Sequence, residues 1–397
     1  MAHAALAAGR DMTVRRTARG AERTPLGDER PDVLICGASF AGLAVARALT
    51  GSGADVLVID RYEIGERATS ACAAPTPWLE AMGLQDAILQ ELPYMSFTTP
   101  HGSVRYRLPW SWSSFDYRRL CELLFAQTDA RFVTAKVERR EPHARGDADH
   151  VVHTDRGTIR SPLVVDALGW RRVLSCAEPA IQPPDAYLSR GLEVHPHRTH
   201  AHGDALDCWV ERGLIRRGYG WRVPAGEEVR VGVGSYEPRD HVKEPTVRLA
   251  ERLGDERVRY QGNWFPHRLR DATEDGVFFC GDSAGHCFPL SGEGIRTAFH
   301  FGLAAGRELR EVHAGRRRRE DALARYHAFS AGHGRAYRIA FALQRLVPAL
   351  PPRVLTLVLR VLDRPKRIDR AFGWYLEQAP PSAVGELPRP AAHATAV

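Results

Sequence analysis

The sequence predicts an α/β protein in which a parallel-sheet domain is interrupted by an antiparallel sheet and followed by helices. Between residues 32 and 60, two short apolar runs flank an Ala-rich segment with helical spacing, which indicates a βαβ unit. Between residues 185 and 265, apolar and polar residues alternate as in strands with one buried face. At 397 residues the chain exceeds the usual size of one domain, so we expect two domains or one with a large insertion.

These patterns divide the chain into six expected parts. The N-terminal segment is rich in Ala, Arg and Gly without a period, and the C-terminal tail is rich in Pro and Ala, so we expect both to be disordered. The expected parts are a disordered segment at 1–30, the first part of a nucleotide-binding domain at 31–184, an antiparallel substrate domain at 185–265, the second part of the nucleotide-binding domain at 266–315, a helical region at 316–380 and a disordered tail at 381–397.

Composition excludes several classes of partner. The net charge of +7 suits anionic ligands, but the charge is dispersed and no zinc-finger or RRM signature occurs, so we expect no nucleic-acid partner. The seven cysteines form no CxxC pair and leave an odd one, which favours a reducing, cytoplasmic environment and predicts no structural metal. No run approaches the roughly 18 apolar residues of a membrane-spanning helix.

The first candidate site lies in the βαβ unit. A glycine motif appears as Gly37-Ala38-Ser39-Phe40-Ala41-Gly42, with serine in place of the middle glycine that lets a pyrophosphate approach the backbone. Asp60 ends the second apolar run 23 residues after Gly37, where a carboxylate can hold ribose hydroxyls. We therefore expect a nucleotide to bind at Gly37, Ser39, Phe40, Ala41, Gly42, Asp60 and Arg61.

The second candidate site is the segment CGDSAGHCFPLSGEGIR, from Cys280 to Arg296. Its small residues let backbone N–H groups approach a ligand, and Asp282 can accept hydrogen bonds from sugar-like hydroxyls. A helix that begins near Gly294 directs its positive end at a phosphate or an electron-rich ring. Such a loop is typical of chains that wrap a flavin, although a glycine-rich connection between a strand and a helix explains it equally well when taken alone.

Together, the two segments resemble FAD enzymes of the glutathione-reductase type, and among these the geranylgeranyl reductase family, which is related to flavoprotein aromatic hydroxylases and flavin-dependent halogenases. The resemblance covers residues 32–307. It implies a glutathione-reductase-type, Rossmann-like FAD-binding domain with an inserted antiparallel sheet and C-terminal helices. It also implies FAD contacts from the backbone of Val137 and from Gly281, Asp282, Pro289, Gly292, Glu293, Gly294 and Ile295. Tyr117 stands where an arginine that contacts FAD is expected; Arg119 or Arg118 would replace it, and a solvated helix face is the alternative.

The substrate is expected to meet Tyr219 and Trp221. The segment Gly218-Tyr219-Gly220-Trp221-Arg222-Val223-Pro224 is similar to the YxWxFP motif of geranylgeranyl reductases, with Val223 in place of the phenylalanine. Residues two apart on a strand share a face, so both aromatics can line a pocket for a small apolar or lipid-like substrate that carries an alkene. An ordinary aromatic pair in a core is the alternative.

Three functions stay open at this stage. The resemblance favours reduction of carbon–carbon double bonds by hydride transfer from reduced FAD. A hydroxylase or epoxidase that uses oxygen is the second candidate, whereas halogenation is disfavoured because Ser96-Phe97-Thr98 stands where a lysine is required. A flavin- or lipid-binding protein without activity is the third. No second glycine-rich βαβ unit occurs, so we expect NAD(P)H without its own domain, or a separate reductase, as electron donor.

The C-terminal region combines apolar residues with arginines. From Ala340 to Leu362 the spacing predicts two short helices on either side of a bend at Pro348, Pro351 and Pro352. An apolar face bordered by arginines is able to rest on a membrane as a peripheral contact, or to pack against the body of the protein. We therefore expect a cytoplasmic protein and leave membrane association open.

Overall fold

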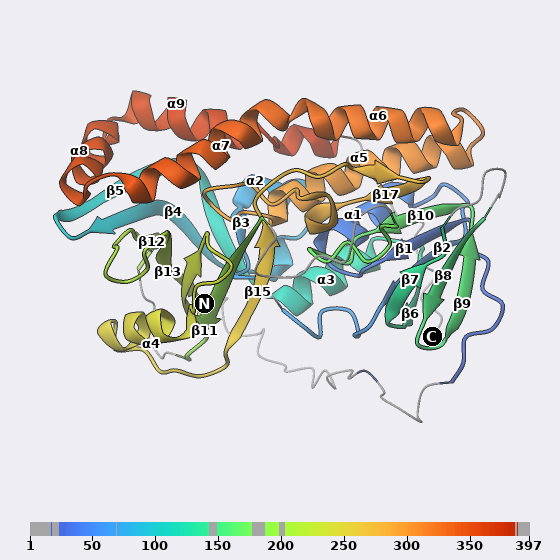
Figure 1. Cartoon of the computed structure of the whole chain (residues 1–397), viewed down its shortest axis with the longest axis horizontal. Coiled ribbons are helices and arrows are strands. Elements are labelled where there is room, and N and C mark those ends of the chain that lie inside the picture. Colours follow the sequence, from blue (N-terminus) through green and yellow to red (C-terminus); the bar gives the residue numbers. More distant parts are fainter. Residues whose placement is uncertain are drawn as a thin grey trace, which may run out of the picture.

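The computed structural model describes residues 17, 24–68, 70–142, 149–176, 187–197, 203–385 and 387. Within them, a six-stranded sheet forms the centre of the domain that is predicted to bind a nucleotide (Figure 1). Its order is β16 (Thr273–Glu274), β17 (Val277–Phe279), β10 (Leu163–Asp166), β1 (Val33–Cys36), β2 (Val56–Asp60) and β6 (Arg131–Thr134), with only β16 antiparallel. Strands β1 and β10 are buried throughout, as expected of parallel strands covered on both faces.

Helices α1 (Phe40–Leu49) and α5 (Ile295–His313) pack tightly together beside this sheet. A Cβ atom at Gly302 of α5 would lie 2.6 Å from the carbonyl oxygen of Ala41 in α1, so the small residue permits the close approach. Helix α3 (Tyr117–Ala126) lies against α1. The βαβ unit predicted at residues 32–60 is confirmed, and it is joined by β17 and α5 from the far end of the chain.

The second sheet has eight strands within the described residues and is antiparallel except where β12 pairs with β4. Its order is β15 (Gln261–Pro266), β11 (Leu188–Val194), β14 (Glu228–Ser235), β13 (Gly218–Ala225), β12 (Ala205–Trp209), β4 (Ile88–Thr99), β5 (Gly102–Phe115) and β3 (Ala73–Pro75). The sequence patterns predict that residues 73–115 belong to the nucleotide-binding domain. In the structure, strands β3, β4 and β5 of this segment belong to the eight-stranded sheet. The long hairpin β4–β5 reaches β12 through a contact remote in sequence, which no local pattern reveals.

The residues just before β1 are hydrogen-bonded to a small third sheet. It consists of β7 (Val137–Arg140), β8 (His150–Thr154) and β9 (Gly157–Ser161). The backbone N–H of Leu26 donates to the carbonyl oxygen of Arg156 at 2.7 Å, and Glu29 bridges to Ile159. The expectation of disorder over 1–30 therefore fails for residues 24–30; residues 1–16 and 18–23 lie outside the described residues.

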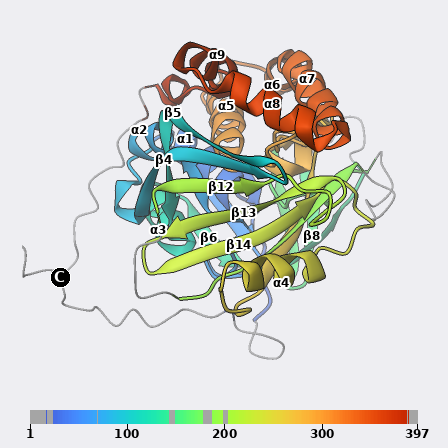
Figure 2. The same ribbon diagram turned by 90° about the vertical axis from the view of Figure 1, so that its left-hand side faces the viewer.

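The C-terminal helices form a layer that covers one side of the molecule, over α5 and the β4–β5 hairpin (Figures 1 and 2). They are α6 (Arg319–Gly332), α7 (Gly334–Leu346), α8 (Pro352–Leu362) and α9 (Pro365–Leu376). A short 3₁₀ turn, Val347–Ala349, separates α7 from α8, which confirms the two helices and the proline bend predicted there. Helix α4 (Lys243–Arg252) lies on the opposite side of the large sheet (Figure 2).

The remaining helical segments are short. They are α2 (Thr76–Ala81) and the 3₁₀ turns η2 (Gln85–Ala87), η3 (Gly281–Ala284) and η5 (Pro381–Val384). Turn η5 corrects the predicted disorder of the tail, because Val384 is buried against the main core; residues 386 and 388–397 lie outside the described part of the chain. Among the described residues, none of the helices combines the length and apolarity that crossing a membrane requires.

Candidate active site

A cavity of about 1770 Å³ lies between the two large sheets and the C-terminal helices. It exceeds the roughly 300–1,000 Å³ that ligand pockets usually occupy, so it has room for a large cofactor and a second molecule. The predicted residues that line it come from both glycine segments and from the aromatic strand: Ser39, Phe40, Ala41, Asp60, Arg61, Val137, Tyr219, Trp221, Gly281, Asp282, Pro289, Gly292, Glu293, Gly294 and Ile295. The fold therefore brings together segments that lie more than 200 residues apart.

Gly37 and Gly42 shape the first turn and do not line the cavity. The φ angle of Gly37 is +114°, which side chains rarely adopt, and a Cβ atom there would lie 2.3 Å from the carbonyl oxygen of Ala167. A Cβ atom at Gly42 would lie 1.9 Å from the carbonyl oxygen of Gly37. Both glycines are thus required for the close packing of β1, α1 and the turn after β10.

Asp60 lies in the cavity wall close to the start of α1. One carboxylate oxygen accepts from the backbone N–H of Ala38 at 2.9 Å, and the other accepts from Tyr62 at 3.1 Å. Burial raises the pKa of Asp60, and these backbone hydrogen bonds oppose the rise. A carboxylate oxygen has two lone pairs, so Asp60 can hold the turn and still accept hydrogen bonds from ribose hydroxyls.

The N-terminus of α1 points its unpaired N–H groups toward the cavity wall formed by Ser39, Phe40 and Ala41. The Ser39 side chain makes no capping hydrogen bond to the helix; its hydroxyl accepts instead from the Tyr117 phenol at 3.1 Å. No acidic residue lies in the first turn. This positive helix end is therefore available to a phosphate.

Arg119 does not occupy the predicted position at the cofactor. Asp116 caps α3 by accepting from the backbone N–H of Arg119 at 2.6 Å, and the Arg119 side chain is exposed and outside the cavity lining. Tyr117 lines the cavity in its place. The cap sets the orientation of the helix, and sequence spacing alone did not reveal it.

Four basic residues that the sequence patterns did not indicate also line the cavity: Arg67, Lys136, Arg171 and Arg190. Lys136 directly precedes Val137 and lies 3.6 Å from Glu138. Arg171 stacks over the Trp170 ring, 5.0 Å from its centroid. Lys136 could have been found from the sequence, because it is a lysine beside the expected FAD contact of Val137 in a chain whose positive charge is almost all arginine.

The second glycine segment forms a wall of the cavity after β17. Gly281 has a φ of +64°, and a Cβ atom there would lie 2.9 Å from the Ala41 side chain, so the residue permits the turn toward α1. Burial raises the pKa of Asp282 to about 6, while Arg270 opposes the rise. Ser283 next to it donates to the buried carboxylate of Asp166 at 2.6 Å, which ties this turn to β10.

The loop at residues 288–293 is held by side chains from other parts of the fold. The Tyr219 phenol donates to the carbonyl oxygen of Ser291, and the Tyr236 phenol donates to that of Leu290 at 2.6 Å. The Tyr375 phenol donates to the Glu293 carboxylate at 2.9 Å. Strand β13, the residue that follows β14 and helix α9 thereby fix the loop that is expected to face the flavin ring.

Glu293 also anchors the start of α5. Its carboxylate forms a buried ion pair with Arg296 at 2.8 Å and accepts from the Arg296 backbone N–H at 2.9 Å. The Arg296 guanidinium donates further to the carbonyl oxygen of Leu376 at 2.6 Å. The Nε and Nη1 atoms of Arg296 are thus bonded, whereas its buried Nη2 atom has no hydrogen-bond partner among the described residues. An ion pair with bonded donors costs less than an isolated buried charge. Glu293 therefore orients the helix end beside Gly294.

Trp221 lies flat against the large sheet. A Cβ atom at Gly232 would lie 2.3 Å from its ring and one at Gly234 3.1 Å, so these glycines leave the space that the indole fills. The Trp221 ring N–H donates to Glu193 at 2.9 Å. The centroid of the Tyr219 ring lies 5.9 Å away. Both aromatics line the cavity, as their shared strand face predicts.

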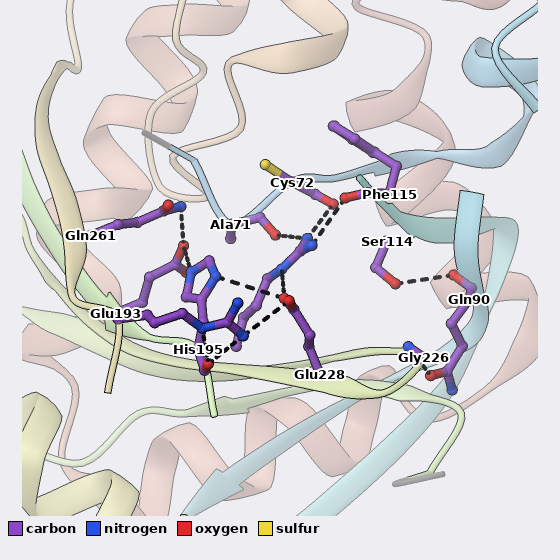
Figure 3. Close-up of polar contacts among 12 residues, drawn as sticks. Ala71, Cys72, Gln90, Ser114, Phe115, Glu193, His195, Gly226, Glu228 and Gln261 are labelled. Atoms are coloured by element: carbon purple, nitrogen blue, oxygen red, sulfur yellow. Dashed lines mark hydrogen bonds and ion pairs between the residues drawn. The ribbon is translucent and has the colours of Figure 1, made fainter. Parts of the chain in front are cut away.

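Glu193 is the centre of a buried polar network (Figure 3). Besides Trp221, its carboxylate accepts from Gln261 at 2.7 Å and lies 2.8 Å from the Nε2 atom of His195. Burial alone would raise the pKa of Glu193, but the hydrogen bonds and charges of His195, Trp221 and Arg230 lower it overall. The carboxylate thus stays ionised, and Trp221 keeps a charged acceptor.

The same network holds the segment that carries Cys72 (Figure 3). The buried guanidinium of Arg230 donates to the carbonyl oxygens of Ala71 at 2.8 Å, Cys72 at 3.0 Å and Phe115 at 3.0 Å. Burial raises the pKa of Cys72 to about 12. The buried thiol therefore stays protonated and packs as a small hydrophobic residue.

The far end of the cavity is apolar. Leu206 and Val223 of the sheet line it, together with a larger set from the β4–β5 hairpin and the C-terminal helices: Met95, Phe97, Trp112, Leu343, Leu346, Val347, Leu350, Leu355, Val358, Leu359, Leu362, Phe372 and Trp374. No charged residue belongs to this apolar set. The cavity is thus polarised between a nucleotide end and an apolar arm, and Tyr219 and Trp221 lie in its wall between them.

The residues of the nucleotide end fit FAD. Asp60 is suited to a ribose, the uncapped start of α1 to a pyrophosphate, and Asp282 to hydroxyls of the ribityl chain. Gly281 and Gly292 are packed closely, because a Cβ atom at these positions would meet Ala41 and Phe265.

Comparison with known proteins identifies the class first. No protein-family model matches the chain. The structure aligns with a geranylgeranyl bacteriochlorophyll reductase-like protein from Thermoplasma acidophilum with a TM-score of 0.76, at 16% identity and over 90% of this chain and 98% of that one. It aligns with the flavin-dependent brominase Bmp2 with a TM-score of 0.68, at 15% identity and over 89% and 97%. The fold is therefore that of FAD-binding oxidoreductases.

Within that class, the sequence is weakly homologous to geranylgeranyl reductases. It is 23% identical over 366 residues to digeranylgeranylglycerophospholipid reductase 2 of Methanopyrus kandleri, covering 84% of this chain and 90% of the relative. The predicted resemblance is thus confirmed, including the relationship to flavin-dependent halogenases.

Proposed function

We propose that this protein is an FAD-dependent reductase that saturates carbon–carbon double bonds in a prenyl-like or other lipid-like substrate. The observation that carries the proposal is the apolar arm of the cavity, which continues past Tyr219 and Trp221 beyond the volume a cofactor needs. A large apolar chain matches this volume and lining, whereas a small polar metabolite would leave most of the wall without a partner. The similarity to prenyl-lipid reductases supports the same choice.

In this proposal the cofactor carries the redox chemistry, since a reduced flavin supplies a hydride when bound. The chain contributes position and exclusion of water. Trp221 is held by Glu193 and presents a fixed wall to the substrate. The Tyr219 phenol keeps its proton, because burial raises its pKa well above the ordinary value, and it donates to Ser291. We therefore assign Tyr219 to positioning the loop and not to proton transfer.

The reaction type is tested by reoxidation of the flavin. The purified protein is loaded with FAD, reduced with dithionite under anaerobic conditions and mixed with prenyl lipids dispersed in detergent. Return of the oxidised flavin spectrum, together with a product heavier by two hydrogens per double bond, is the expected result. Reoxidation by oxygen alone contradicts the reductase. A protein that stays colourless with added FAD would favour the non-catalytic alternative.

An oxygen-using flavoenzyme is the second candidate, because a flavin-dependent brominase shares the fold over 89% of the chain. Phe97, within the Ser96–Thr98 segment, lines the cavity where a halogenase was expected to carry a lysine, so hydroxylation or epoxidation fits better than halogenation. Product formation that requires oxygen and consumes NAD(P)H would support it. The same assay identifies the electron donor, since we expect NAD(P)H or a separate reductase to restore reduced flavin.

A further inference from the structure

Helix α8 exposes an apolar stripe on the outside of the molecule. Val354, Leu357, Val358 and Val361 occupy positions i, i+3, i+4 and i+7 and are 43%, 61%, 42% and 48% exposed. These positions share one face of a helix. In a helix whose apolar face packs against its own protein, such residues would be buried.

The opposite face of α8 is attached to the body. Leu359 packs in a cluster with Tyr106 of β5, and the Thr356 hydroxyl lies 2.6 Å from that of Thr99 in β4. Leu355 is only 6% exposed. The helix therefore has two apolar faces, and the body of the protein covers one of them.

Cations surround the exposed stripe. The exposed basic residues between positions 353 and 370 are Arg353, Arg360, Arg364, Lys366, Arg367 and Arg370, against two acidic residues, Asp363 and Asp369. With six basic and two acidic residues, these residues together carry four net formal positive charges. An amphipathic helix with an apolar face and flanking Lys and Arg residues matches the chemistry of an anionic membrane surface.

The apolar arm of the cavity reaches the surface beside this stripe. Leu346, Val358 and Trp374 line the cavity and are also 52%, 42% and 38% exposed, so they form its rim. Val358 belongs both to the rim and to the stripe. Figures 1 and 2 show α8 at the outer edge of the helical layer, across the large sheet from α4. The rim and the exposed stripe therefore share one side of the molecule.

We propose that α8 docks this protein onto the surface of an anionic phospholipid bilayer, with the mouth of the cavity against the lipid. With 11 residues α8 is about 16 Å long, about half the thickness of the hydrocarbon core of a bilayer, so it lies in the plane of the interface. A lipid-like substrate then enters between α7, α8 and α9 without crossing water. The route of entry rests on the proposed function, whereas the docking does not.

The test measures co-sedimentation of the full-length, FAD-loaded protein with vesicles. One set of vesicles is phosphatidylcholine alone, and the other contains phosphatidylglycerol in addition. We expect binding to the anionic vesicles and a decrease of about tenfold or more in the double variant Leu357→Asp/Val361→Asp. Neither residue lines the cavity. Val258→Asp, at a residue that is 39% exposed beyond α4, is the matched control and should bind like wild type.

A second variant tests the charges. Arg353→Gln/Arg364→Gln should weaken binding to anionic vesicles by about thirtyfold, because each of the two cations near such a surface contributes about 1 kcal/mol, and should leave any binding to phosphatidylcholine unchanged. Equal binding of wild type and Leu357→Asp/Val361→Asp overturns the proposal. So does a wild-type dimer in vesicle-free buffer that this variant converts to a monomer, since the stripe would then contact a second copy.

Different outcomes contradict the docking proposal and the reductase proposal. With substrate dispersed in detergent, Leu357→Asp/Val361→Asp should turn over like wild type, whereas substrate embedded in vesicles should react more slowly. If wild type binds vesicles but reduces neither form of substrate, the reductase proposal fails and the docking stands. If turnover is normal but anionic vesicles are not bound, the docking fails and the reaction stands.

Discussion

The phenol of Tyr219 donates a hydrogen bond to the carbonyl oxygen of Ser291. Tyr236, which directly follows the neighbouring strand β14, donates to the preceding carbonyl oxygen, that of Leu290. Two adjacent carbonyl groups of the loop are thus fixed by the large sheet and the residue after one of its strands. Tyr219 also lines the cavity, so it connects the wall that is expected to contact the substrate with the loop that is expected to face the flavin.

Tyr219→Phe should loosen the expected flavin site without emptying the cavity. The substitution removes the donor to Ser291 and leaves a buried acceptor without it, which costs about 1–3 kcal/mol. We expect a lower free energy of unfolding and faster release of FAD, followed by the rise of free-flavin fluorescence after dilution. Tyr260→Phe is the matched control, since Tyr260 is 44% exposed. Equal FAD release from both variants would contradict the positioning role.

The two halves of the nucleotide end could be predicted from sequence because each is a local pattern. The βαβ unit places Gly37 and Asp60 through strand and helix periodicities, and the Cys280–Arg296 segment carries its own turn residues. The structure brings both segments to one cavity, as expected. Tyr219 and Trp221 were predictable for the same reason, since alternation on a strand fixes which residues share a face.

The remaining features depend on contacts remote in sequence. Pairing of β4 with β12 joins residues about 110 positions apart, and local patterns do not encode it. The carboxylate partner of Trp221 is Glu193, which lies 28 residues earlier and shows no motif. Arg119 was misplaced because the Asp116 cap fixes the orientation of α3.

Gly232→Ala should change substrate binding more than protein stability. A Cβ atom at this position would lie 2.3 Å from the Trp221 ring, so the indole must move into the cavity. Such overpacking typically costs about 1–3 kcal/mol. We expect a raised KM for long apolar substrates with little loss of bound FAD. Gly213→Ala is the control, because no atom lies within 4 Å of the added methyl group.

Glu193→Gln should remove a part of the acid sensitivity of the protein. The pKa of Glu193 is lowered in the folded protein, so its ionised form stabilises the fold above the ordinary glutamate pKa, and this contribution is lost as pH falls through the folded value. The difference in free energy of unfolding between wild type and variant should therefore shrink below about pH 4.5. Urea titrations at several pH values measure it. A difference that stays constant down to pH 3 would contradict the assignment.

Substitution of Asp282 should affect cofactor binding and apo-protein stability in opposite directions. At pH 7 the carboxylate accepts hydrogen bonds, so Asp282→Ala should weaken FAD binding by about tenfold or more, which corresponds to one charge-assisted hydrogen bond. Without cofactor, the pKa of about 6 means that ionisation of Asp282 opposes folding.

The free energy of unfolding of the wild-type apo-protein should therefore fall by about 1–3 kcal/mol relative to that of Asp282→Asn as pH rises from about 4 through 6. The reason is that a carboxyl group with a raised pKa stabilises the fold only at low pH, where it is protonated. Flavin fluorescence titrations and urea unfolding of the apo-protein test the two effects separately. Tight retention of FAD by Asp282→Ala would show that this carboxylate does not hold the cofactor.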